Sequence, residues 1–217
     1  DMVNLKPKYK LAFEVAAAIV LMTVGKVSLD VIRLPMGISI DMGLVSFIVN
    51  YVWIIGITNA VTLIDGLDGL AGGISAIILV VIACLSVIEG RLDIQTMSLI
   101  LAGATMGFLL YNSHPASIFM GDCGALFLGF IISAISLLGF KSSTIMTLAL
   151  PILLLAVPIV DTIGAILRRK LSGHKFSEAD KNHLHHLLMQ RFGHRNTVII
   201  LYVVTALFGF TAYIYLI

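Results

Sequence analysis

Charged residues are scarce in this chain of 217 residues. Only 12% of the residues are Asp, Glu, Lys or Arg, whereas a soluble domain usually carries about 25%. Hydrophobic residues make up 59% of the chain, and the mean hydropathy is +1.05. This composition excludes an ordinary soluble globular protein and predicts a chain that lies in a lipid bilayer.

Basic residues and cysteines are also few. The formal net charge is only +2, and so few basic residues cannot neutralise a track of phosphates, which excludes a nucleic-acid partner. The two cysteines, Cys84 and Cys123, cannot form a disulfide framework. The first ten residues lack the pattern of a cleavable signal peptide. Because the chain begins with Asp1 rather than Met, we expect it to start within a longer sequence.

Long apolar runs are the main feature that is present. A bilayer core of about 30 Å needs roughly 20 apolar residues per helix, and the runs lack the alternation of a lipid-facing β-barrel. We therefore predict an all-α integral membrane protein, a polytopic helical bundle that forms a single membrane domain over residues 1–217. About seven transmembrane helices are expected, near residues 11–27, 44–61, 69–89, 94–112, 123–140, 144–166 and 197–217.

The distribution of Lys and Arg predicts the orientation. Most of them fall in the loops on one side, which the positive-inside rule places in the cytoplasm, with the N-terminus inside. Residues 28–43 contain Pro35 and predict a turn or short hairpin on the outer surface. Residues 168–196 predict a structured cytoplasmic loop, in which Ser177 and Asp180 form a capping box that opens a short helix.

Uncommon polar residues gather at the predicted cytoplasmic face. They are Asp1, Asn59, Asp65, Asp68, Asn112, His114, Asp122, Asp161, His183, His185 and His186. The acidic residues of the outer side, in contrast, form no dense motif. The sequence therefore predicts that any chemistry faces the cytoplasm.

The motif TNAVTLIDGLDGLAGG, residues 58–73, carries two carboxylates three positions apart. Asp65 and Asp68 therefore share one face of a helix or turn. Because paired carboxylates repel, they favour a divalent cation, a cationic side chain or a proton nearby. The alternative is that the glycines pack helices and the acids are solvated loop residues. The high cost of carboxylates at membrane level favours a functional role for the acids.

Two further groups complete the polar set. Asp122, flanked by Gly121 and Gly124, is either a helix N-cap or a ligand for a hard metal such as Mg²⁺, which needs only one or two carboxylates beside substrate phosphates. In the cluster at residues 183–186, the three histidines could bind metal, exchange protons or contact phosphate. Asp161 is either an ion-pair partner of Arg168 or functional. Together these residues indicate a metal-assisted reaction on a phosphate compound at the inner membrane face.

Three motifs in their order carry a family resemblance: TNAVTLIDGLDGLAGG, FMGDCGALFLG and FSEADKNHLHHLL. The chain resembles the polyprenyl-phosphate N-acetylhexosamine-1-phosphate transferases of glycosyltransferase family 4. The spacing HLHHLL is similar to the WecA/TagO-like branch rather than to the branch with consecutive histidines.

The resemblance implies an enzyme of the bacterial cytoplasmic (inner) membrane whose active site faces the cytoplasm. Such an enzyme transfers a sugar-1-phosphate, here N-acetylglucosamine-1-phosphate, from a UDP-sugar to undecaprenyl phosphate and releases UMP. This is the first membrane step of a cell-envelope glycan. The implied cofactor is Mg²⁺, with Mn²⁺ as an alternative, and a homodimer is left open.

The resemblance also implies roles for individual residues. Catalytic roles fall to Asp1, Asp65 and Asp68, and metal binding to Asp122 and Asp65. Substrate-binding roles fall to Asn59, Asn112, His183, His185 and His186. There are departures from the family pattern: Asp1 matches only the second residue of an Asp pair, so the N-terminal part of the family is expected to be missing. Thr62 stands where relatives usually carry Asn, and Ala125 replaces a frequent serine.

Two alternatives remain at this stage. The intramembrane acids Glu14 and Asp161 suggest an ion- or proton-coupled transporter. A transporter should show inverted repeats and acids near the bilayer midplane, whereas here the acids gather at one face. The second alternative is an inactive truncated remnant of a transferase.

Overall fold

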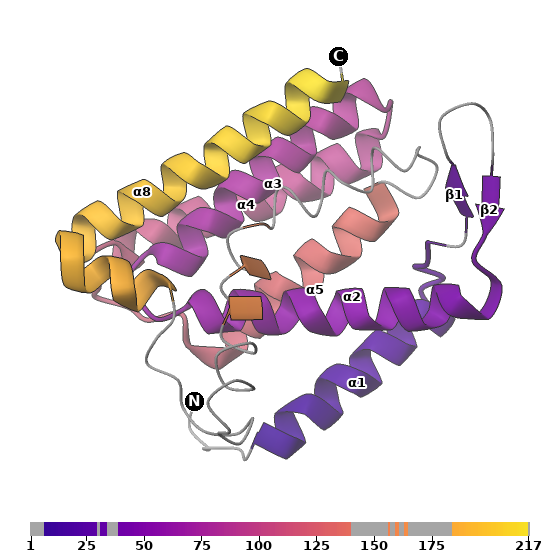
Figure 1. The fold of residues 1–217 in the computed structure, drawn as a ribbon, viewed down its shortest axis with the longest axis horizontal. Coiled ribbons are helices and arrows are strands. Elements are labelled where there is room, and N and C mark those ends of the chain that lie inside the picture. Colours follow the sequence, from indigo (N-terminus) through magenta and orange to yellow (C-terminus); the bar gives the residue numbers. More distant parts are fainter. Residues whose placement is uncertain are drawn as a thin grey trace.

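The computed structural model is a bundle of long helices with one small hairpin (Figure 1). It describes residues 7–29, 31–33, 39–139, 156, 159–160, 163–164 and 184–216. Its elements are α1 (Pro7–Thr23), β1 (Val31–Arg33), β2 (Ser39–Asp41), α2 (Gly43–Ile64), α3 (Leu70–Ile88), α4 (Leu92–Asn112), α5 (Gly121–Gly139) and α8 (Leu184–Leu216). The predicted helical class is confirmed.

Five of these helices are long and apolar enough to cross a bilayer. They span Gly43–Ile64, Leu70–Ile88, Leu92–Asn112, Gly121–Gly139 and Leu187–Ile214. The first four agree with prediction, and the fifth begins earlier than the predicted span 197–217. Helix α1 has 17 residues, about 25 Å at 1.5 Å per residue, and falls in the predicted span 11–27. The predicted span 144–166 lies almost entirely outside the described residues, so the count of seven is not confirmed.

Helix α3 is the centre of the bundle. Its sequence LAGGISAIILVVIACLSVI carries no charge, and a helix that is apolar all round is expected to be buried. In the membrane-spanning window of α3, 67% of the residues are buried, against 22% for α4. The outward faces of α2, α4 and α8 expose large apolar side chains, among them Leu44, Leu110 and Phe210. The chain is a multi-pass membrane protein.

Helices α2 and α5 pack with their backbones close together. A Cβ atom at Gly129 would lie only 2.8 Å from the Cα of Thr58. Small residues allow this kind of approach between membrane helices. The contact holds the C-terminal half of α2 against α5, the two helices that carry Asp65 and Asp122 at their ends.

The hairpin lies at the end of the bundle where α2 begins. β1 and β2 pair antiparallel, with Val31 opposite Asp41, which confirms the hairpin predicted within residues 28–43. The chain just before it is fixed to α2, because Leu29 donates its N–H to the Oδ1 of buried Asn50 at 3.0 Å. Ser46 donates its hydroxyl to the carbonyl of Leu29 at 2.8 Å.

Helix α8 bends at Gly193, which has φ 76° and ψ 170°. The residues before the bend, 184–192, are helical, so the predicted loop 168–196 overlaps α8 from Leu184 onward. The predicted capping box of Ser177 and Asp180 lies outside the described residues. After the bend, α8 runs along α3 to the end of the chain (Figure 1).

The connections define two ends of the bundle. Helix α2 ends and α3 begins at one end, where α4 also ends and α5 begins. We call this the site end, made of residues 65–69 and 113–120 with the adjoining helix termini. The opposite end holds the hairpin and the short connection between α3 and α4, residues 89–91.

Candidate functional site

A polar cavity of about 310 Å³ lies at the site end. It is lined by Thr62, Asp65, Gly66, Leu67, Asp68, Asn112, Phe119, Met120, Gly121 and Asp122. The structure therefore brings together four of the residues predicted from sequence, the three aspartates and Asn112. They come from two motifs more than 40 positions apart, as the hydrogen bond between Gly69 and Asn112 at this end illustrates.

Two larger hollows have a different character. One of about 670 Å³ lies between α3, α4 and α8, and one of about 520 Å³ lies beside α2. Their walls are almost wholly apolar, with side chains such as Val80, Phe210 and Val52. Apolar walls suit lipid tails, whereas the polar cavity at the site end presents groups that can act on a charged substrate.

Asp65 follows the last residue of α2 and is partly buried. Its N–H donates to the carbonyl of Thr62 at 3.3 Å. Burial, and after it the negative charge of Asp122, raise the pKa of the Asp65 carboxyl to about 6. The two carboxylates therefore destabilise each other's charge, and a cation between them would relieve this repulsion.

Asp122 stands in the first turn of α5, directly after Gly121, whose φ of 65° lies in the left-handed region. The carboxylate forms an ion pair with Lys10 of α1. At 42% exposure its side chain remains accessible from the cavity. Two carboxylates from separate elements beside one polar cavity are a donor set that suits Mg²⁺, which takes one or two carboxylates and keeps water or phosphate oxygens as its other ligands.

Asp68 is held by the loop between α4 and α5. One carboxylate oxygen accepts a hydrogen bond from the N–H of Ala116 at 3.2 Å and lies 3.0 Å from Nδ1 of His114. The hydrogen bond from His114 is the main reason why the pKa of Asp68 lies below its usual range. Asp68 therefore loses its proton at lower pH than Asp65, although both belong to the same short turn.

Asn112 connects the two loops of the site end. It is 3% exposed, and its Oδ1 accepts the N–H of Gly69 at 3.1 Å while its Nδ2 donates to the carbonyl of Ile118 at 2.9 Å. Gly69 directly precedes α3 and has φ 78°, a left-handed conformation that favours glycine. Asn112 thus fixes the backbone around the cavity, and its contact with a substrate stays a prediction.

Among the remaining predicted site residues, the structure describes the side chain of Asn59, which does not line the cavity. Asn59 donates Nδ2 to Glu14 of α1 at 2.5 Å and to the carbonyl of Ile55 at 2.9 Å, which gives Glu14 a partner that the sequence did not indicate. Three of the predicted residues lie outside the described residues: Asp1, Asp161 and His183. His185 and His186 belong to the first turn of α8, but their side chains also lie outside the description.

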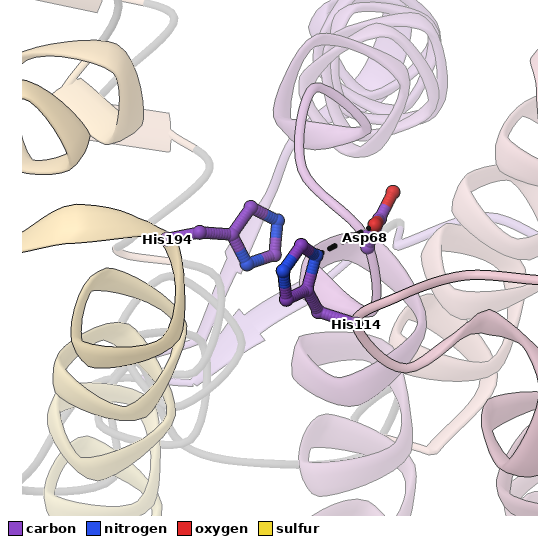
Figure 2. A group of neighbouring side chains, drawn as sticks. All are labelled: Asp68, His114 and His194. Atoms are coloured by element: carbon purple, nitrogen blue, oxygen red, sulfur yellow. Dashed lines mark hydrogen bonds and ion pairs between the residues drawn. The ribbon is translucent and has the colours of Figure 1, made fainter.

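Two histidines at the site end were given no role from sequence. The rings of His114 and His194 stack with their centroids 4.1 Å apart and an interplanar angle of 27° (Figure 2). Donor atoms of Asp68, His114 and His194 all lie within 4.8 Å of one another. Ring nitrogens donate in the plane of the ring, so nearly parallel rings do not aim at one ion, and the arrangement favours stacking over chelation.

Of these two histidines, only His114 could be placed at the site from the sequence. His114 follows Asn112 by two positions and was already placed at the cytoplasmic face. His194 stands beyond the histidine cluster of residues 183–186 and forms no pattern with it. Its position became evident only from the packing of α8.

Comparison with known proteins adds to this geometry. The model of glycosyl transferase family 4 matches residues 1–140, which include both motifs that line the cavity. The chain belongs to glycosyl transferase family 4. The family resemblance inferred from the three motifs is therefore confirmed.

Three family 4 relatives illustrate the range of similarity. A probable undecaprenyl-phosphate N-acetylglucosaminyl 1-phosphate transferase of Bacillus subtilis is 43% identical over 216 residues, 98% of this chain and 60% of that protein. A decaprenyl-phosphate N-acetylglucosaminephosphotransferase of Mycobacterium tuberculosis is 35% identical over 230 residues, 94% of this chain and 56% of that protein. A phospho-N-acetylmuramoyl-pentapeptide-transferase of Bacillus pumilus is 36% identical over 162 residues, 73% of this chain and 48% of that protein. The chain thus spans between about half and 60% of the length of these relatives.

Proposed function

We propose that this family 4 chain transfers a sugar-1-phosphate from a UDP-sugar to undecaprenyl phosphate and releases UMP. The observation that carries the proposal is the polar cavity at the site end, where carboxylates from two distant motifs meet on a bundle with apolar sides. Such a place lets a water-soluble nucleotide sugar meet the phosphate of a lipid whose tail stays in the bilayer. The names of the relatives support the same chemistry.

Within this proposal, Asp65 and Asp122 hold Mg²⁺, with Mn²⁺ as the alternative. Their fit to such an ion rests on their position beside one polar cavity and on the pKa of Asp65, which burial and then the charge of Asp122 raise. When bound, the ion neutralises charge on the phosphates and helps UMP to leave. The chain's own residues supply the rest: Lys10 places a positive charge beside Asp122, and Asp68 is kept ionised by His114.

The remaining predicted residues take supporting roles in the proposal. Asn112 keeps the two loops at a fixed separation, because both of its amide atoms bind backbone groups. The histidine motif, with His185 and His186 in the first turn of α8, is proposed to contact the phosphates of the nucleotide sugar. The site end faces the cytoplasm of a bacterial inner membrane in this proposal, in agreement with the distribution of Lys and Arg.

We propose N-acetylglucosamine-1-phosphate as the transferred group. The named N-acetylglucosamine relatives match 98% and 94% of this chain, whereas the muramoyl-pentapeptide transferase matches 73%. The spacing HLHHLL supports the same choice. Discrimination between these sugars depends on groups that bind the sugar's substituents, so this assignment needs a direct comparison of both substrates.

The test uses the complete natural form of the protein, purified in detergent, with Mg²⁺ and undecaprenyl phosphate. UDP-N-acetylglucosamine and UDP-N-acetylmuramoyl-pentapeptide are supplied in separate reactions, and UMP is measured by chromatography. We expect UMP only with the first sugar and only with both Mg²⁺ and the lipid present. UMP release from the second sugar alone would overturn the sugar assignment, and no release from either would overturn the transferase.

A further inference from the structure

Helix α8 contacts the site end at two separate points. Near the middle of α8, Tyr202 donates its hydroxyl to the carbonyl of Gly69 at 2.5 Å. Directly after the bend at Gly193, His194 stacks on His114, which in turn binds Asp68 (Figure 2). We call His114, His194 and Tyr202 the α8 clamp.

The contact with Tyr202 leaves no spare room. A Cβ atom at Gly73 would lie 1.8 Å from the Tyr202 hydroxyl oxygen and 2.5 Å from its ring carbon Cε1. The absence of a side chain at Gly73 therefore leaves the space that the tyrosine ring occupies beside α3. The Tyr202 hydroxyl can therefore reach the carbonyl of Gly69, the residue that directly precedes α3.

The described contact between the two histidines is a stacking of their rings. Nδ1 of His194 is buried, and within the part of the chain that the structure describes it has no hydrogen-bond partner. The stacked ring of His114 therefore supplies the contact that holds His194 to the loop. His114 in turn restrains the position of Asp68, because its Nδ1 lies 3.0 Å from the Asp68 carboxylate.

We propose that His114, His194 and Tyr202 are positioning residues through which helix α8 sets the place of the Asp68 carboxylate in the polar cavity. The same helix carries His185 and His186 in its first turn. Docking of α8 therefore holds His114 and, through it, Asp68. The link to catalysis rests on the proposed function, whereas the clamp itself can be tested without it.

The first measurement is amide hydrogen exchange of the purified protein. Two amides report on the clamped turn, since Gly69 donates its N–H to Asn112 and Ala116 donates its N–H to Asp68. We expect His194→Ala to raise exchange in peptides covering both amides by about tenfold. His194→Phe keeps a flat ring for stacking and should restore protection close to the wild-type level.

The second measurement is the rate of UMP release under the conditions given above. We expect kcat/KM to fall about tenfold in His194→Ala and to recover to within about threefold in His194→Phe. Ile199→Ala serves as the control, because Ile199 lies on the same helix and is exposed away from the bundle. It should change neither exchange at the two amides nor turnover.

The outcomes separate the clamp from the proposed function. Wild-type exchange at both amides in a folded His194→Ala protein would overturn the clamp. Increased exchange with unchanged turnover would overturn the positioning role, and so would a loss of turnover that His194→Phe does not rescue. If the wild-type protein releases no UMP, the transferase proposal fails, while the exchange experiment still decides whether α8 holds the turn.

Discussion

The two ends of the bundle use their polar residues in different ways. At the site end, hydrogen bonds join residues far apart in the sequence: Asp68 binds His114 and Ala116, 46 and 48 positions away. At the opposite end, the charged pair Arg91 and Asp93 is two positions apart and caps the turn between α3 and α4. The opposite end pairs its charged side chains within one connection, whereas the site end brings charged groups together from several elements.

Charge is also balanced differently at the two ends. Arg91 faces an acidic partner and a backbone carbonyl, that of Leu138. At the site end, Asp65 is partly buried near a second carboxylate, and its pKa rises to about 6. A protein keeps such a costly arrangement of like charges mainly where it has a use. The comparison therefore marks the site end as the functional one.

The largest expected effect comes from removing one charge at the site end. Asp122→Asn should lower turnover by at least about a thousandfold, because the amide can no longer hold a divalent cation. The protein should still fold, since Asp122 is 42% exposed and lies in the first turn of α5. Turnover is measured by UMP release, and folding by thermal melting. Wild-type turnover in this variant would show that Asp122 only caps the helix.

A smaller effect on turnover and a clear effect on stability are expected for Asn112→Ala. The change leaves the N–H of Gly69 and the carbonyl of Ile118 without their partner, at a cost of about 2–3 kcal/mol. Turnover should fall about tenfold as the loops lose their fixed separation. The measurements are chemical denaturation and UMP release. Asn112→Asp keeps an acceptor for the N–H of Gly69, so its stability and turnover should lie between those of the wild type and of Asn112→Ala. An equal loss in both variants would contradict this explanation.

The matching experiment at the opposite end is Asn50→Ala. The buried amide of Asn50 binds the N–H of Leu29 and the hydroxyl of Ser46, so its loss should lower the free energy of unfolding by about 2 kcal/mol. Turnover at a temperature where the variant is folded should equal that of the wild type. A selective rise in KM at that temperature would show that the two ends are coupled.

The smallest effect is expected for Asp93→Asn. The ion pair with Arg91 is exposed to solvent, and exposed pairs contribute little to stability. Neither the melting temperature nor the rate of UMP release should change beyond experimental error. A clear drop in melting temperature would mean that this connection matters more than its exposure indicates.

Much of the fold was predictable because lipid imposes a simple pattern on the sequence. Long uncharged runs located α2, α3, α4 and α5, and the mixed residues 28–43 indicated the hairpin. The meeting of Asp65, Asp68 and Asp122 in one cavity also agrees with their prediction at one face. These features follow from hydrophobicity and from the sidedness of loops, both of which are local properties of the sequence.

The contacts between distant helices were not predictable in this way. Lys10 pairs with Asp122 across 112 positions, and Tyr202 reaches Gly69 across 133. Such pairs depend on how helices cross and rotate, which apolar periodicity does not specify in a chain that is apolar all round. For the same reason, the stacking of His194 on His114 could not be predicted from the sequence. The hydrogen bond between Asn59 and Glu14 could not be predicted either.

The charge-free sequence of α3 has a consequence for how the protein is made. A segment this apolar is stable in lipid on its own, so it can insert before its neighbours and exchange lipid for protein contacts later. The turn that precedes it, Asp65 to Gly69, then reaches the membrane surface while α4, α5 and α8 are still to come. During biosynthesis, the residues of this turn that line the cavity are therefore in place first. The lining residues near α4 and α5 join them later.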